Sequence, residues 1–170
     1  MLPDLAADLA ADLAREVRGS ASLPLPILVL RLLGAALLCA VIGYEREASA
    51  RSAGLRTNML VGLAAASYAV ITYEMAGLYD DRGEALRMDP LRLVEATTAG
   101  VAFLAAGMIV LSRGRVKNLT TGALLWLSAA IGLAAGNGLW AVAVLATFLG
   151  LAIGLLRGAQ PQKPDDEDRG

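Results

Sequence analysis

The 170-residue chain has no histidine and a single cysteine, Cys39. The lack of histidine excludes Ser/His/Asp and Cys/His catalysis. A single cysteine excludes an intrachain disulfide and a cysteine-cluster metal site. Aromatic residues make up 5% and charged residues 18% of the chain, whereas 56% is hydrophobic and the mean hydropathy is +0.57. A soluble domain would have too little polar surface at this composition, and a disordered chain needs low hydrophobicity. The composition indicates a membrane protein, and we expect neither an enzyme nor a bound cofactor.

Charge of either sign is absent from long stretches of the chain. No Asp, Glu, Lys or Arg occurs from Asn118 to Leu156, and these 39 residues as one helix would reach roughly 58 Å, about twice the hydrocarbon thickness. The run must fold back, and Gly136-Asn137-Gly138 is the expected turn. Only helices and closed barrels satisfy the backbone inside lipid, and the strict alternation of a barrel strand is missing.

We therefore predict an all-α, polytopic integral membrane protein with five transmembrane helices. The spans are expected at about residues 24–43, 57–76, 91–111, 120–136 and 139–156, in a transmembrane domain of residues 23–157. Residues 1–22 form an outer N-terminal segment, and residues 158–170, rich in Pro, Asp and Glu, form a disordered cytoplasmic tail. A soluble Ala/Leu bundle is the alternative, but its helices would need charged outer faces.

Lysine and arginine accumulate on the cytoplasmic side of membrane proteins and so predict the orientation. Nine lie in the connections on one side: Arg46, Arg51, Arg56, Arg113, Arg115, Lys117, Arg157, Lys163 and Arg169. Five lie on the other side: Arg15, Arg18, Arg82, Arg87 and Arg92. We expect a multi-pass protein of the bacterial inner membrane, with its N-terminus outside and its C-terminus in the cytoplasm. The net charge of −1 argues against a nucleic-acid partner.

A shift of 64 residues places segment 55–66 over segment 119–130, with Leu55, Thr57, Leu60, Leu63, Ala65 and Ala66 meeting their own residue type. Both copies put a basic loop, and then a threonine at the start of a helix, on the same membrane side. Chance similarity between Leu/Ala-rich helices is one explanation. The other is a parallel two-helix repeat, in which spans 1–2 and 3–4 correspond, as in some transporters.

Three short blocks lie near the predicted helix ends: Gly43-Tyr44-Glu45-Arg46-Glu47, Ala53-Gly54-Leu55-Arg56-Thr57 and Leu119-Thr120-Thr121. With the glycine-containing segment 100–107, their order and spacing over about residues 28–157 resemble the MgtC/SapB family of bacterial inner-membrane proteins, in a short form without the soluble C-terminal domain of larger members. The chain departs from the family pattern at four positions, where it has Asn58, Ala96, Ala102 and Ala105.

The resemblance implies a link to growth in low magnesium, survival inside host cells and, for some members, control of the ATP synthase. The matching blocks and their arginine-rich surroundings form the expected cytoplasmic motif: Glu45, Arg46, Glu47, Arg51, Gly54, Arg56, Thr57, Thr120 and Thr121. Arginines and helix N-termini at this face attract anions, with the threonines as caps. Lipid headgroup contact is one role for the face, and docking to an acidic surface of a membrane partner is the other.

An intramembrane polar cluster is expected near the outer side. Arg31 lies about 10 Å into the first span, and Glu74 and Glu95 lie at similar depth. A pair of Arg31 with either glutamate would keep the groups charged, whereas snorkelling of Arg31 to the headgroups is the alternative. These carboxylates, with Asp89 at the edge, form a poor path for dehydrated Mg²⁺, and the metal ligands, if any, stay unassigned.

Small residues in three spans are expected to let helices approach closely, within the bundle or between copies of the chain. They are Gly100, Gly107, Gly132, Gly136, Gly150 and Gly154.

Our functional expectation is a non-enzymatic inner-membrane protein, linked to magnesium limitation or stress adaptation, that regulates a larger membrane complex such as the ATP synthase. A small transporter for Mg²⁺ or a solute is the alternative. The expected partners are lipids, this complex and further copies of the chain.

Overall fold

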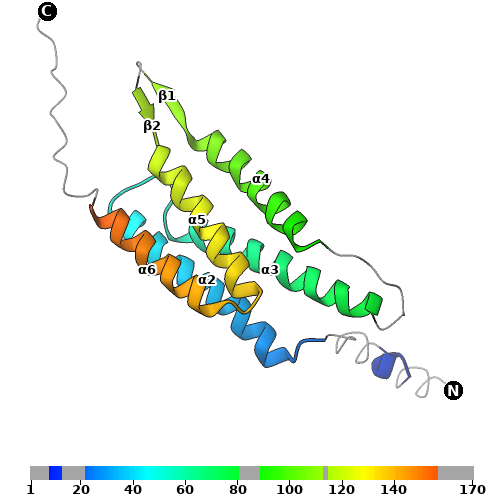
Figure 1. The fold of residues 1–170 in the computed structure, drawn as a ribbon. Helices are drawn as coiled ribbons and strands as arrows, with labels where there is room; N and C mark the ends of the chain where they lie inside the picture. Colours follow the sequence, from blue (N-terminus) through cyan, green and yellow to red (C-terminus); the bar gives the residue numbers. More distant parts are fainter. Residues whose placement is uncertain (1–7, 13–21, 81–88, 113–114, 157–170) are drawn as a thin grey trace, which may run out of the picture.

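The protein is an all-α membrane protein whose helices run up and down in one bundle (Figure 1). The computed structural model describes residues 8–12, 22–80, 89–112 and 115–156. Its elements are α2 (Leu25–Ala48), α3 (Leu55–Asp80), α4 (Pro90–Met108), β1 (Val110–Ser112), β2 (Arg115–Lys117), α5 (Leu119–Gly136) and α6 (Trp140–Leu156). In this part of the chain, α2 to α5 each contain a stretch long and apolar enough to span a membrane, and α6 is a shorter apolar helix of 17 residues.

The two ends of the bundle differ in their helix termini. One end, called here the arginine-rich end, holds the C-termini of α2, α4 and α6, the N-termini of α3 and α5, and the hairpin of β1 and β2 (Figure 1). The opposite end holds the other termini of the five helices. The predicted N-terminal segment and tail lie largely or wholly outside the described residues, apart from a helical turn at residues 8–12 and Ser22.

Local sequence explains where two of the helices start. Prolines stand in the first turn of both α2 and α4, where the missing N–H costs no hydrogen bond. Asp89 caps α4, since its carboxylate accepts a hydrogen bond from the Leu91 N–H at 2.9 Å.

The predicted third span ends earlier than the sequence suggested. The helix stops at Met108, and residues 110–112 instead pair with 115–117 in an antiparallel hairpin, with Leu111 opposite Val116. Ile109 takes an extended conformation, and the Asn118 side chain donates a hydrogen bond to the Met108 carbonyl at 3.1 Å. β-Branched residues favour extended backbone, and the asparagine satisfies one of the carbonyls left open where the helix ends.

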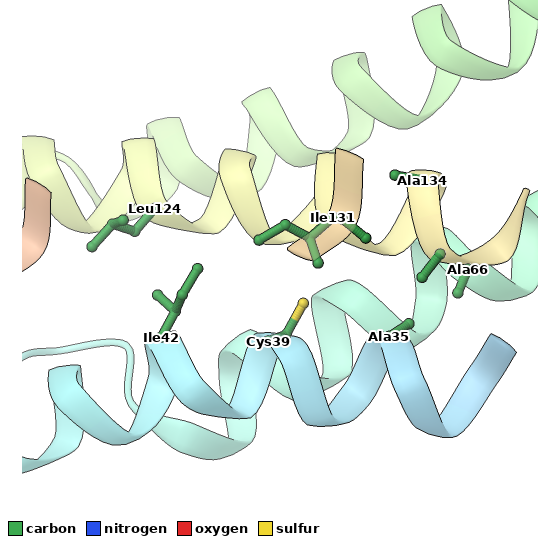
Figure 2. Packing of buried hydrophobic residues seen from close by; sticks show 9 residues of the cluster. Ala35, Cys39, Ile42, Ala66, Leu124, Ile131 and Ala134 are labelled. Atoms are coloured by element: carbon green, nitrogen blue, oxygen red, sulfur yellow. The ribbon is translucent and has the colours of Figure 1, made fainter. Parts of the chain in front are cut away.

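Helix α5 forms the centre of the bundle and contacts α2, α3, α4 and α6. In the apolar stretch of α5, 61% of the residues are buried, against 11% in α4. Figure 2 shows Ala35, Cys39 and Ile42 of α2 facing Leu124, Ile131 and Ala134 of α5. The repeat would superpose α3 on α5, but these two helices are buried to different extents in the bundle. The internal repeat therefore stays a prediction.

Candidate functional site

Arg46 connects two helices at the arginine-rich end. It lies in the last turn of α2, is only 5% exposed, and its Nη2 donates a hydrogen bond to the Thr121 hydroxyl in the first turn of α5 at 2.9 Å. A cation is favourable at a helix C-terminus, and a buried guanidinium requires hydrogen bonds. The structure thus brings together two of the residues predicted for the cytoplasmic motif, and both have a structural role.

Glu47 and Gly54 shape the start of α3. The Glu47 carboxylate accepts a hydrogen bond from the Leu55 N–H at 2.8 Å, so it caps this N-terminus from eight residues upstream. A side chain at position 54 would place its Cβ 2.8 Å from the same carboxylate oxygen, which explains the glycine. Glu45 instead accepts a hydrogen bond from the Ser49 hydroxyl at 3.0 Å. These carboxylates therefore bind a backbone amide and a serine at the arginine-rich end.

The remaining motif residues are more accessible. Arg51 and Arg56 are exposed, and Thr57 and Thr120 are half-buried. Lys117, in the nearby hairpin, is also exposed. The described cations at the surface of this end are therefore Arg51, Arg56 and Lys117, and we call them the basic surface.

A buried polar network joins α2, α3 and α5, and the sequence analysis did not find it. The Ser128 hydroxyl donates to the Asn58 amide oxygen at 2.8 Å, and the Asn58 amide nitrogen donates to the carbonyls of Ala53 and Gly54 at 3.3 and 2.8 Å. The Cys39 thiol donates to the Ser128 carbonyl at 3.4 Å. All three side chains are buried. Polar residues inside two apolar spans were the available signal, but it did not identify them as partners.

At the opposite end, the expected cluster of Arg31, Glu74 and Glu95 is not assembled among the described residues. Arg31 Nη1 donates to the Gly136 carbonyl at the end of α5 at 3.0 Å, and its guanidinium lies 5.7 Å from the centre of the Tyr73 ring. Glu74 accepts hydrogen bonds from the backbone N–H groups of Ser22 and Leu23, at 2.6 and 2.9 Å, just before α2. Helix termini supply the opposite partial charges that these side chains need. Glu95 is exposed on α4.

The six glycines expected at helix contacts fall into two groups. A Cβ at Gly132 would collide with the Gly62 carbonyl oxygen, and a Cβ at Gly136 would lie 2.6 Å from the Ala66 carbonyl oxygen, so α5 packs directly on the backbone of α3. Gly150 faces the Leu127 side chain, and Gly154 faces Glu45. By contrast, a Cβ at Gly100 or Gly107 of α4 would have no neighbour within 4 Å.

A groove lies between α3 and α4, with a volume of about 560 Å³. Its wall is mostly apolar, with Leu93, Gly100 and Leu104 on the α4 side and Tyr68 and Thr72 on the α3 side. Among the described residues, no three Cys, Asp or Glu side chains are grouped so that they could hold a metal ion.

In a comparison with known protein families, the model described as "MgtC family" matches residues 32–161 of this chain. Protein MgtC of Brucella abortus (strain 2308) is 38% identical over 133 residues, which cover 78% of this chain and 52% of the relative. "Putative magnesium transporter YhiD" of Escherichia coli K12 is 32% identical over 126 residues, 74% of this chain and 58% of the relative.

Protein SrpB of Synechococcus elongatus is 38% identical over 132 residues, which cover 73% of this chain and 71% of the relative. The chain therefore spans little more than half the length of the Brucella and E. coli relatives. No solved structure matches it.

Proposed function

Since the chain belongs to the MgtC family, we propose that it is a non-enzymatic protein of the bacterial inner membrane that helps the cell adapt to magnesium limitation by binding a larger membrane complex. Its N-terminus would lie outside and its arginine-rich end in the cytoplasm, as the lysine and arginine counts favour. The resemblance to the family makes the ATP synthase a candidate for the complex.

The observation that carries this proposal is the packing at the centre of the bundle. Gly132 and Gly136 bring α5 onto the backbone of α3, while Cys39 of α2 fills the space beside Gly62. Helices in backbone contact form a rigid body with a dense centre. Such a body is better suited to presenting its surface to a partner than to conducting ions between its helices.

The basic surface is the part of this body that we expect to meet the partner. Arg46, Glu47 and Thr121 bind within the chain, whereas Arg51, Arg56 and Lys117 are exposed at the same end. Exposed cations near a membrane attract acidic surfaces, at about 1 kcal/mol per Lys or Arg. An acidic surface of the complex, next to the membrane, would therefore be bound by these residues.

The double variant R51Q/R56Q tests the proposal. In cells grown at limiting magnesium, the full chain should be cross-linked in native membranes and purified with its partner. Recovery of the partner should fall about tenfold in R51Q/R56Q, because two attractive charges are lost, and should persist in the charge-preserving control R51K/R56K. The first variant should also fail to restore growth of a deletion strain at limiting magnesium. Equal recovery from both variants would contradict the proposal.

A small transporter for Mg²⁺ or a solute is the second candidate. The E. coli relative is named as a magnesium transporter, which favours this candidate, as does the parallel repeat that the sequence suggests. Purified protein in liposomes separates the two candidates, because a transporter moves its ion without any partner. Magnesium uptake above that of empty liposomes would favour transport over regulation.

A further inference from the structure

The outward face of α4 has no partner among the residues that the structure describes. Arg92, Glu95, Ala99, Gly100, Phe103 and Gly107 are among its exposed residues, and we call these six the α4 face. Phe103 is 84% exposed, whereas Gly100 and Gly107 leave open space on either side of it. A lipid-facing helix gains nothing from exposed glycines, whereas a helix contact does, because they let a second backbone approach.

Polar groups also lie at or beside this face. Glu95 is an exposed carboxylate about one and a half turns into an apolar helix, where a charge facing lipid is costly. Thr97 lines the adjoining groove and is only 8% exposed. A charged or polar group inside the membrane is favourable only beside a polar partner. The occupant of this face should therefore bring a polar group to the depth of residues 95–97.

We propose that this occupant is a second copy of the chain, and that the protein forms a two-fold dimer through α4. Both copies insert in the same direction, so their α4 helices run parallel about an axis along the membrane normal. Arg92 and Glu95 carry opposite charges on one face, three residues apart. The two-fold axis then places Arg92 of each copy near Glu95 of the other, at the depth of the groove's Thr97.

The apolar part of the face is self-complementary in the same arrangement. Phe103 projects from each helix, and the glycines three residues before and four residues after it leave a hollow at each side. Positions at this spacing form one hole in parallel helix packing, so Phe103 of one copy fills the hollow of the other. This dimer does not depend on the proposed function, and it also closes the groove from the lipid side.

Cysteine cross-linking in native membranes tests the dimer. In a Cys39→Ala background, Phe103→Cys should form disulfide-linked dimers on mild oxidation, at least tenfold more than the control Ile153→Cys. Ile153 lies on α6, is 63% exposed, and is 13 residues from its helix start, as Phe103 is in α4. Equal monomer fractions for both variants, or a disulfide from Phe103→Cys to a different protein, would overturn the dimer.

A charge exchange provides a second test. The single change R92E should lower the Phe103→Cys cross-link about threefold, and the exchange R92E/E95R should restore it, since the pairs across the axis are re-formed with reversed sign. Gly100→Leu should remove the cross-link by filling the hollow, whereas Ala141→Leu on the exposed face of α6 should not. If the exchange variant stays as low as R92E, the charges do not meet across the axis and the arrangement is wrong.

Discussion

At the scale of single residues, polar side chains in this protein mostly bind backbone groups. Glu47, Glu74 and Arg31 each serve a helix terminus rather than one another. The sequence showed that these charges lie at the ends of spans, but it gave no information about their partners, because every terminus offers a similar partial charge. The pairing depends on which helices are neighbours, and this is set by packing far from the charged residues.

The network of Asn58 and Ser128 is expected to stabilise the bundle measurably. Ser128→Ala would leave the buried amide oxygen of Asn58 without its hydrogen bond, at a cost of about 1–3 kcal/mol. Ser67→Ala is the matched control, because the Ser67 hydroxyl binds only the Leu63 carbonyl in its own helix. Thermal unfolding in detergent should show a lower midpoint for Ser128→Ala alone. Identical midpoints would mean that the amide finds another donor.

Arg31 allows a prediction about the opposite end. Arg31→Leu removes both the hydrogen bond to Gly136 and the contact with the Tyr73 ring, which together connect α2 with α5 and α3. We expect a loss of about 1–3 kcal/mol, and only partial recovery with Arg31→Lys, because an ammonium is not a planar fork. Protease accessibility of the turn at Asn137 would report the loosened end. Wild-type resistance in Arg31→Leu would show that these two contacts do not hold this end of the bundle together.

At the scale of the elements, α2 and α3 continue past the predicted span ends at residues 43 and 76, to Ala48 and Asp80, but the predicted spans and the observed helices agree where turn residues mark the ends. The charge-free run and its Gly136-Asn137-Gly138 turn are an example, since α5 ends at Gly136 and α6 begins at Trp140. The third helix was predicted three residues too long, because hydropathy does not distinguish an apolar strand from an apolar helix. The identity of the central helix was also hidden, since all the spans are rich in Ala, Leu and Gly.

The two groups of glycines should respond in opposite ways to the same substitution. Gly132→Ala puts a methyl group onto the Gly62 carbonyl and should separate α3 from α5, so that little folded protein is recovered. Gly107→Ala meets open space within the single chain and should raise the stability of α4 there by up to about 1 kcal/mol through helix propensity. Fluorescence-detected size exclusion of the two variants checks this contrast, which fails if both elute like the wild type.

At the scale of the whole molecule, composition and charge clustering were enough to predict a helical membrane protein, since the hydrocarbon layer admits few other structures. They could not predict that α5 would be the buried centre of the bundle, nor that α4, although it packs against α5, would keep most of its surface exposed. That asymmetry follows from the distribution of small residues. Gly132 and Gly136 on α5 meet neighbours within the chain, whereas Gly100 and Gly107 on α4 face open space.

The meeting of Cys39, Gly62 and Gly132 has a consequence for how such proteins can evolve. Three helices share one small volume there. The sulfur of Cys39 occupies the space that a side chain at position 62 would need, and Gly132 lies over the carbonyl of Gly62. A bulkier residue at one of these positions can be accommodated only if another becomes smaller. Natural sequences should therefore conserve the combined size of the three residues rather than the identity of each.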